Sequence, residues 1–323
     1  MNRTAIALIS GGLDSLLAAK IIAMQGINVH GVTFRTPFFG PEKAIQAAKR
    51  LQLSLTVLDI TEDHLIMLKA PRYGYGRNMN PCIDCHTLML HHAGKLMESI
   101  GADFIITGEV AGQRPMSQGK QTLVLVARNS GYGDYILRPL SAQLLPETKP
   151  EREGLVDRNK LLGIQGRGRK EQLKLAAQYG ITEYSTPAGG CLLTDPSFSR
   201  RLKDLLSHNP EPQLREIELL KYGRHFRISP EKKIIVGRNS QDNKGILSFA
   251  APEDEIVTLL NHPGPTVLII GGGDEEIRKM AARLCLLYGG LREGDVCISS
   301  STGERVVEAE AMGKEEAKQL IIT

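Results

Sequence analysis

Short apolar segments and amphipathic segments alternate through the first half of the chain. Strand signals occupy residues 4–9, 28–34, 53–58 and 102–107, of which the first and the last are apolar, and helical patterns occupy residues 16–22, 41–51, 61–68 and 83–100. Such alternation predicts an α/β fold, in which a doubly wound parallel sheet carries helices on both faces. Ligands bind beyond the carboxyl ends of the strands in this architecture, where Ser10, Phe34 and Thr107 lie.

The second half of the chain shows a weaker pattern. Between Ser141 and Arg169 the periodicity fades in a stretch with two prolines and several glycines, and helical patterns return at residues 170–178 and 197–220. They are followed by strand signals at residues 226–228, 233–236 and 266–270, and by a helical pattern at residues 274–287. We therefore expect two domains: residues 1–210 form the α/β domain, and residues 211–323 form a second, smaller α+β domain.

The segment Ser10-Gly11-Gly12-Leu13-Asp14-Ser15 joins the first apolar strand to the first helix. Unpaired backbone N–H groups and the helix dipole favour an anion at a helix N-terminus, and the two glycines let the backbone approach it closely. Ser10 and Ser15 add hydroxyl groups. A carboxylate beside phosphates needs a cation between them, so we interpret Asp14 as a magnesium contact or a water-positioning group. The loop matches neither G-x-x-x-x-G-K-[ST] nor G-x-G-x-x-G.

Composition limits the class of protein. With 323 residues, 41% of them hydrophobic and 24% charged, the chain is long enough for two globular domains. It has no run of 18 apolar residues, and its N-terminus leads directly into the first strand, so we expect a cytoplasmic protein without a membrane span. The net charge of +4 is uneven, because residues 144–245 hold 19 Lys and Arg against 13 Asp and Glu. This basic stretch favours an extended polyanion as partner.

Three of the five cysteines indicate a metal or sulfur site. Cys82 and Cys85 form a C-x-x-C pair at the start of the longest helical pattern, and Cys191 follows a Gly-Gly pair. Thiolates at this spacing can occupy two corners of one metal site, and a helix N-terminus lowers the pKa of a thiol. Zinc requires a fourth ligand, for which His86 is the nearest candidate. Three cysteines without a fourth suit a [4Fe–4S] cluster with one open iron that holds the sulfide to be transferred.

The Ser10–Ser15 loop resembles the SGGxDS loop of the PP-loop ATP pyrophosphatases. Enzymes of that superfamily cleave ATP between the α and β phosphates, transfer AMP to a carbonyl or carboxyl oxygen, and let a nucleophile displace the AMP. The resemblance implies a HUP-like sheet and ATP as the cofactor. It also implies pyrophosphate contacts from Ser10, Gly11, Gly12 and Ser15, adenine near the backbone of Phe34, and a catalytic role for Asp14.

The segment from Gly101 to Gln118 carries a second signature. A strand signal ends at Thr107-Gly108-Glu109, and a polar loop follows with Gly112, Gln113, Ser117 and Gln118. This pattern resembles the TGExxGQxxSQ segment of the tRNA 4-thiouridine synthetases, and Ile-Leu-Arg-Pro-Leu at residues 136–140 is similar to the next landmark of that family. The resemblance covers roughly residues 4–195. It implies nucleotide contacts from Thr107, Gly108, Glu109 and Gln113.

The same resemblance bears on the cysteines and on RNA. Some tRNA thiolases of this superfamily place a C-x-x-C pair and one distant cysteine around a [4Fe–4S] cluster, and others use two of these positions as a persulfide carrier and a resolving thiol. The synthetases begin with an RNA-binding module, whereas this chain opens on its first strand. Residues 235–243 and 262–265 are similar to the RNA-binding domain of the NFACT proteins, which provides another way to hold RNA.

Together these patterns predict an ATP-dependent tRNA thiolase that adenylates a uridine carbonyl oxygen and replaces it with sulfur. The GQxxSQ segment favours 4-thiouridine over the wobble 2-thiouridine. Cys82, Cys85 and Cys191 would deliver the sulfur, from a donor that the sequence leaves open. There are two alternatives. A PP-loop ligase that forms amides has no use for three converging cysteines, and a non-catalytic RNA-binding adaptor predicts damage in a loop that is intact.

Overall fold

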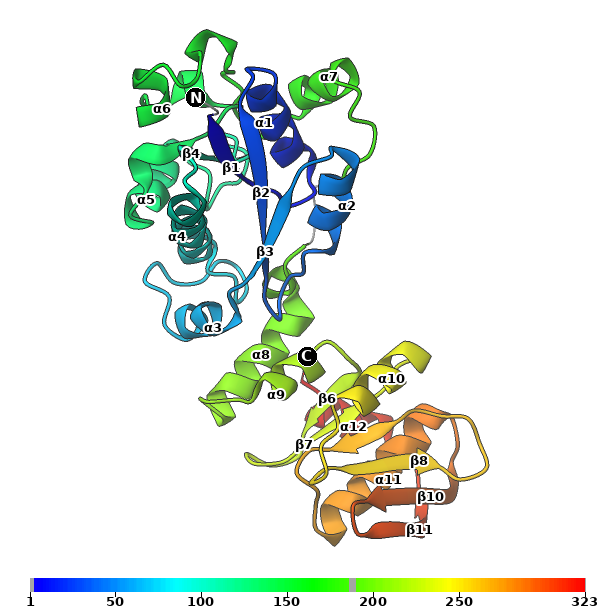
Figure 1. Cartoon of the computed structure of the whole chain (residues 1–323). Helices are drawn as coiled ribbons and strands as arrows, with labels where there is room; N and C mark the ends of the chain where they lie inside the picture. Colours follow the sequence, from blue (N-terminus) through cyan, green and yellow to red (C-terminus); the bar gives the residue numbers. More distant parts are fainter. Residues whose placement is uncertain (1–2, 186–189, 323) are drawn as a thin grey trace. The chain divides into compact units, whose positions relative to one another are not determined.

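The computed structural model describes residues 3–185 and 190–322. It divides the chain into two compact units, Met1–Leu192 and Leu193–Thr323 (Figure 1). The Gly-Gly pair that precedes Cys191 lies partly outside the described residues, because Gly189 is not among them. None of the described helices is long and apolar enough to cross a membrane.

The first unit is built on a parallel sheet of five strands in the order β3-β2-β1-β4-β5. The strands are β1 (Thr4–Leu8), β2 (Asn28–Arg35), β3 (Leu55–Asp59), β4 (Phe104–Ile106) and β5 (Ile136–Leu137). The helices are α1 (Leu13–Ala23), α2 (Glu42–Arg50), α3 (Thr61–Lys69), α4 (Cys82–Ile100), α5 (Lys120–Asn129), α6 (Lys149–Arg152) and α7 (Lys170–Gln178). The predicted doubly wound parallel sheet is therefore confirmed.

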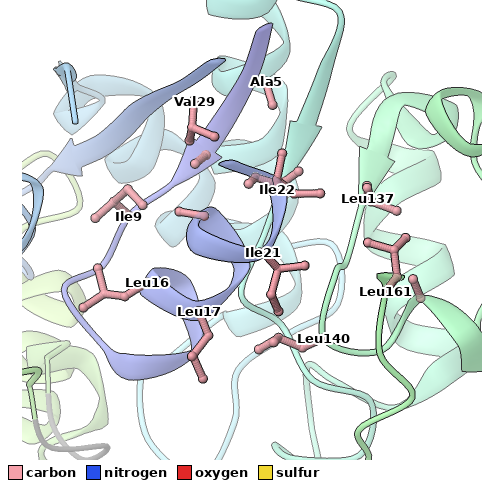
Figure 2. Packing of buried hydrophobic residues seen from close by; sticks show 14 of the residues in the cluster. Ala5, Ile9, Leu16, Leu17, Ile21, Ile22, Val29, Leu137, Leu140 and Leu161 are labelled. Atoms are coloured by element: carbon pink, nitrogen blue, oxygen red, sulfur yellow. The ribbon is translucent and has the colours of Figure 1, made fainter. Parts of the chain in front are cut away.

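Both faces of this sheet are buried. Side chains alternate across a strand, so Ala5 and Ala7 of β1 pack with α1, α2 and α7, while Ile6 packs with α4 and α5 on the other face. Figure 1 shows the two groups of helices on opposite sides of the sheet. Figure 2 shows the packing on this first face, where Leu16, Ile22 and other apolar side chains of α1 lie in one cluster with Ala5 and Val29 of the sheet.

Helix α1 is apolar on almost every side. It buries eight of its eleven residues, because the sheet covers one side of it and α7 lies against another. Each buried Leu or Ile side chain contributes about 1.5–3 kcal/mol through removal from water. The N-terminus of α1 is therefore fixed in the core at the carboxyl end of β1.

The second unit contains an antiparallel sheet of six strands in the order β11-β10-β8-β9-β7-β6. The strands are β6 (Arg224–Arg227), β7 (Lys233–Val236), β8 (Glu255–Leu259), β9 (Val267–Ile269), β10 (Glu293–Ser300) and β11 (Gly303–Glu310). The helices are α8 (Pro196–His208), α9 (Leu214–Leu219), α10 (Ser240–Ser248), α11 (Glu275–Gly289) and α12 (Lys314–Leu320). Helix α11 fills one face with Ala281, Leu284 and other apolar residues. The expectation of a smaller α+β unit is confirmed.

Helix α8 belongs to the second unit, whereas the boundary predicted at residues 210 and 211 would leave it in the first. Its Arg201 Nη1 donates to the carbonyl of Gly223, 3.1 Å away, and its Asp204 pairs with Arg227 of β6 at 2.5 Å. These polar contacts join α8 to the first strand of the antiparallel sheet. The charged sequence of the helix did not indicate which sheet it would meet.

Candidate nucleotide and cysteine site

The Ser10–Ser15 loop forms a tight turn between β1 and α1. The hydroxyl of Ser15 donates to the carbonyl of Gly12 at 2.8 Å, and the Gly12 N–H donates to Ser10 Oγ at 3.3 Å. Gly11 has a φ of +77°, and a Cβ there would meet the carbonyl oxygen of Lys43 at 2.6 Å. The shape of the loop therefore requires glycine at this position. The turn leaves the first backbone N–H groups of α1 at its end, as an anion site needs.

The loop after β4 lies directly against the first turn of α1. A Cβ on Gly108 would lie 2.4 Å from the backbone nitrogen of Ser15 and 2.5 Å from the backbone carbon of Asp14. Only glycine allows this approach, so the structure brings the Thr107-Gly108-Glu109 segment to the phosphate loop. Phe34 ends up with its side chain in the core, which leaves only its backbone for the predicted adenine contact.

The two carboxylate oxygens of Asp14 differ. Oδ2 accepts a hydrogen bond from Gln113 Nε2 at 2.8 Å, whereas Oδ1 is buried and has no hydrogen-bond partner among the described residues. A buried carboxylate oxygen without a partner is costly, and it is a ligand that Mg²⁺ prefers. The chemistry of Asp14 therefore fits a magnesium ion beside the loop.

Glu109 is buried in a polar cluster rather than open to a ligand. Its Oε2 accepts from Thr107 Oγ1 at 3.1 Å and from Arg138 Nε at 2.9 Å, and its Oε1 lies 2.7 Å from His86 Nδ1. Burial alone would raise the pKa of Glu109, but Arg138 and His86 outweigh it and lower the pKa to about 2. Both oxygens have protein partners, so the predicted nucleotide contact from Glu109 stays a prediction.

His86 links the cysteines to the nucleotide segment. It lies in the first turns of α4, directly after Cys85, and it binds Glu109. The sequence indicated His86 as the nearest candidate for a fourth zinc ligand. Its hydrogen bond to Glu109 gives His86 a different structural role. Nothing in the sequence indicated that these two residues would lie in contact.

The structure brings the three predicted cysteines into electrostatic range of one another. Cys82 begins α4, where Asn80 Nδ2 donates to its sulfur at 3.2 Å. Burial raises the pKa of the Cys85 thiol, and the neighbouring Cys191 and Cys82 raise it further. We expected the helix N-terminus to lower this pKa, but the pKa of Cys85 is raised, chiefly by desolvation of the thiolate.

Two aromatic residues and a histidine support this cluster. The N–H of Leu192, next to Cys191, donates to the carbonyl of Phe38 at 2.9 Å. The rings of Phe38 and Phe39 lie 5.4 and 5.7 Å from the ring of His64. His64 Nε2 in turn lies 3.5 Å from Cys85 Sγ, and burial lowers the pKa of His64 to about 4. Sequence reasoning missed His64, because an isolated histidine in an amphipathic helix gives no signal.

The metal predicted for this cluster stays a prediction. Among residues 3–185 and 190–322, no group of three or more His, Cys, Asp or Glu side chains is arranged to hold a metal ion. His86, the candidate fourth ligand for zinc, is hydrogen bonded to Glu109. Three thiols remain the donor set that a [4Fe–4S] cluster with one open iron would use.

Two family models match separate parts of the chain. Residues 1–143 match the ThiI family, described as thiamine biosynthesis protein, and residues 223–321 match the NFACT protein RNA binding domain. The first unit thus contains a region similar to ThiI, and the second contains a region similar to the NFACT RNA binding domain. The ThiI-like match includes the phosphate loop, Cys82 and Cys85, and it ends before α7 and Cys191.

Individual relatives match part of the chain. The tRNA-specific 2-thiouridylase MnmA of Clostridium acetobutylicum is 32% identical over 127 residues, which are 33% of this chain and 36% of the relative. MnmA of Mesoplasma florum is 24% identical over 242 residues, which are 65% of this chain and 61% of the relative. The chain thus spans less than two thirds of each relative.

Among solved structures, a 4-thiouridine synthetase in complex with RNA and bound ATP is 20% identical to this chain. The match covers 60% of this chain and 46% of the other, at a TM-score of 0.39. Because this structural similarity is weak, the similarity of the two units to ThiI and to the NFACT RNA binding domain is based on the family models.

Proposed function

We propose that this protein is an ATP-dependent tRNA sulfurtransferase. One observation carries the proposal: the helix that begins with Cys82 and Cys85 is tied to the phosphate loop through His86, Glu109 and the Gly108–Ser15 contact. An ATP site and a thiol cluster within one unit suit a reaction that activates an oxygen and then replaces it with sulfur. The ThiI-like model and the MnmA relatives support the same reaction class.

The reaction has two steps. First, a uridine carbonyl oxygen attacks the α-phosphorus of ATP, so that an O–P bond forms, the α–β anhydride bond breaks, and pyrophosphate leaves. Backbone N–H groups of the Ser10–Ser15 loop bind the pyrophosphate, and Asp14 is the residue that would hold a magnesium ion or a water molecule beside it. In the second step a sulfur nucleophile forms a C–S bond at the activated carbon, and the C–O bond breaks with loss of AMP. Adenylation is needed because AMP leaves far more readily than an oxide.

Cys82, Cys85 and Cys191 are the proposed sulfur-handling residues. A [4Fe–4S] cluster held by the three thiols would supply an open iron site for the sulfide. A persulfide on one cysteine, with a second as resolving thiol, is the competing arrangement. No step above depends on which of the two is present.

The position of the modified uridine separates two forms of the proposal. The TGExxGQxxSQ segment, with Gly112, Gln113, Ser117 and Gln118, favours 4-thiouridine. The name of the MnmA relatives, tRNA-specific 2-thiouridylase, favours 2-thiouridine as the second candidate. The NFACT-type domain is the proposed tRNA-binding element in both forms.

The test is nucleoside analysis of tRNA from cells that lack the protein, with and without a plasmid that restores it. Loss of 4-thiouridine supports the first form, and loss of 2-thiouridine supports the second. If every thiolated nucleoside is retained at its normal level, the proposed function is wrong.

A further inference from the structure

Three polar side chains from three separate segments form one line that ends at the phosphate loop. Gln172 Nε2 of α7 donates to Gln113 Oε1 at 3.2 Å, and Gln113 Nε2 donates to Asp14 Oδ2 at 2.8 Å. Gln172 is completely buried, with an exposed fraction of 0%. We refer to Gln172, Gln113 and Asp14 as the amide line.

The direction of the amide line is fixed by the carboxylate. An ionised Asp14 only accepts hydrogen bonds, so Gln113 must turn its NH₂ group toward it. The carbonyl oxygen of Gln113 then faces Gln172, which must present its own NH₂ group. Turning either amide over would place two acceptors against each other. The line therefore has one stable arrangement.

Burial of the amide line has a cost in folding free energy. A buried amide costs about 1–3 kcal/mol for each group left without a partner, and Gln172 Oε1 has none among the described residues. The Gln172 side chain is buried in the core, where a leucine would cost less desolvation free energy. At the other end of the line, Asp14 Oδ2 accepts the hydrogen bond from Gln113, and the buried Oδ1 has no hydrogen-bond partner among the described residues.

We propose that Gln172 is a positioning residue for Asp14. By fixing Gln113 it fixes the rotation of the Asp14 carboxylate, so that Oδ1 presents one lone pair to the cation of the magnesium nucleotide. Magnesium demands near-ideal octahedral geometry, so a carboxylate that rotates would bind it poorly. This inference rests on the proposed function only in that the loop binds ATP.

The test measures nucleotide binding without any turnover. The Kd for ATP is determined by calorimetry on the full chain, with Mg²⁺ and with EDTA, for the wild type and for Gln172→Leu. We expect Gln172→Leu to weaken binding about fivefold with Mg²⁺, as for loss of a hydrogen bond between two neutral amides, and to have little effect in EDTA. Gln143→Leu is the control, because it removes another side-chain amide, exposed and bonded to the carbonyl of Leu161, outside the line.

Two further variants separate positioning from packing. Gln172→Glu keeps the shape of the side chain but sets an acceptor against Gln113 Oε1, so it should lose Mg²⁺-dependent affinity as Gln172→Leu does. The double variant Gln113→Leu with Gln172→Leu should be no weaker than Gln113→Leu alone, since both act through one line. Additive effects, or equal losses with Mg²⁺ and EDTA, would overturn the inference. A wild type that binds no ATP would overturn the proposed function as well, whereas normal wild-type binding with unchanged variants would overturn only the role of Gln172.

Discussion

The backbone N–H of Ser185 donates to the carbonyl oxygen of Gly11 at 2.9 Å, and Ser185 and Gly12 form a parallel bridge. The segment that leads from α7 toward Cys191 is thus paired with the phosphate loop itself. On its other side, the residue after Cys191 pairs with Phe38. Ser185 therefore contacts the phosphate loop, and Leu192, next to the third cysteine, contacts Phe38.

Replacement of Asp14 tests the catalytic role of the loop. Asp14→Ala should lower pyrophosphate release by about 10²-fold or more, because a charged group next to the reacting phosphates is lost. The fold should survive, since the side chain makes one hydrogen bond to Gln113. Pyrophosphate release is measured with tRNA present, and Asp14→Asn serves as a control that keeps an acceptor for Gln113. Normal release from Asp14→Ala would contradict the assignment.

Gly108 lies in the loop after β4 and provides a steric test of the contact between this loop and α1. A methyl group at this position would overlap the backbone of Ser15, so Gly108→Ala should cost about 1–3 kcal/mol of stability and weaken ATP binding. Gly168→Ala is the matched control, because a Cβ there would meet no atom within 4 Å. Urea unfolding and ATP affinity are measured for both. Equal behaviour of the two variants would show that the close approach is not needed.

The metal content of the protein distinguishes the states of the cysteine cluster. With a [4Fe–4S] cluster, anaerobically prepared protein should be brown and hold about four irons per chain. Each of Cys82→Ala, Cys85→Ala and Cys191→Ala should then lose iron and thiolation together. In a persulfide relay the protein would be colourless. Iron-free protein that thiolates tRNA at full rate would rule out the cluster.

A buried lysine makes the stability of the second unit increase with pH in the alkaline range. Burial lowers the pKa of Lys233 to about 8 from its usual 10.5, and Nζ has no hydrogen-bond partner among the described residues. The unfolded chain therefore binds more protons between pH 8 and 10.5, so this group makes the unit more stable as the pH rises through that range. Below pH 8 its charge costs up to about 3 kcal/mol.

Lys233→Met should remove that cost. The unfolding free energy of the second unit should rise at pH 7, and the gain should shrink as the pH approaches 10. Hydrogen exchange of the β7 amides reports the stability of this unit within the full chain. A gain of equal size at pH 7 and pH 10 would show that packing, and not charge, controls this position.

The placement of α8 predicts how truncations behave. Phe198, Leu202 and Leu205 of α8 are buried, and Arg201 is bonded to Gly223. A chain that ends after Leu220 loses β6 and exposes this apolar face, so we expect it to aggregate, whereas a chain that ends after Leu192 should stay monodisperse. The shorter chain should bind ATP but bind tRNA weakly, with a smaller dependence on salt. Undiminished tRNA affinity of the shorter chain would contradict an RNA-binding role of the second unit.

The sequence predicted the first unit better than the second for a physical reason. Strand β1 is covered on both faces and is almost entirely apolar, and β2 buries most of its residues. Strand β11 is an edge strand with alternating exposure and three glutamates, so its apolar signal is weak, and the hairpin with β10 was missed. The turn Ser301-Thr302 between them, followed by Gly303, was the available signal.

The site was predictable where chemistry depends on adjacent residues and not where it depends on packing. The phosphate loop and the C-x-x-C pair could be found because their spacing is local. The pairings of His86 with Glu109 and of His64 with Cys85 join segments that are distant in the sequence. A single sequence holds no information that links such pairs before the sheet order is known.

The burial of α1 has a consequence for the energetics of ligand binding. Because the helix is locked between the sheet and α7, the phosphate loop at its N-terminus is ordered by folding and not by the nucleotide. The conformational entropy of the loop is thus lost before ATP arrives, and no part of the binding free energy is consumed in ordering it. ATP association should therefore be rapid, and its heat capacity change should reflect the buried nucleotide surface alone.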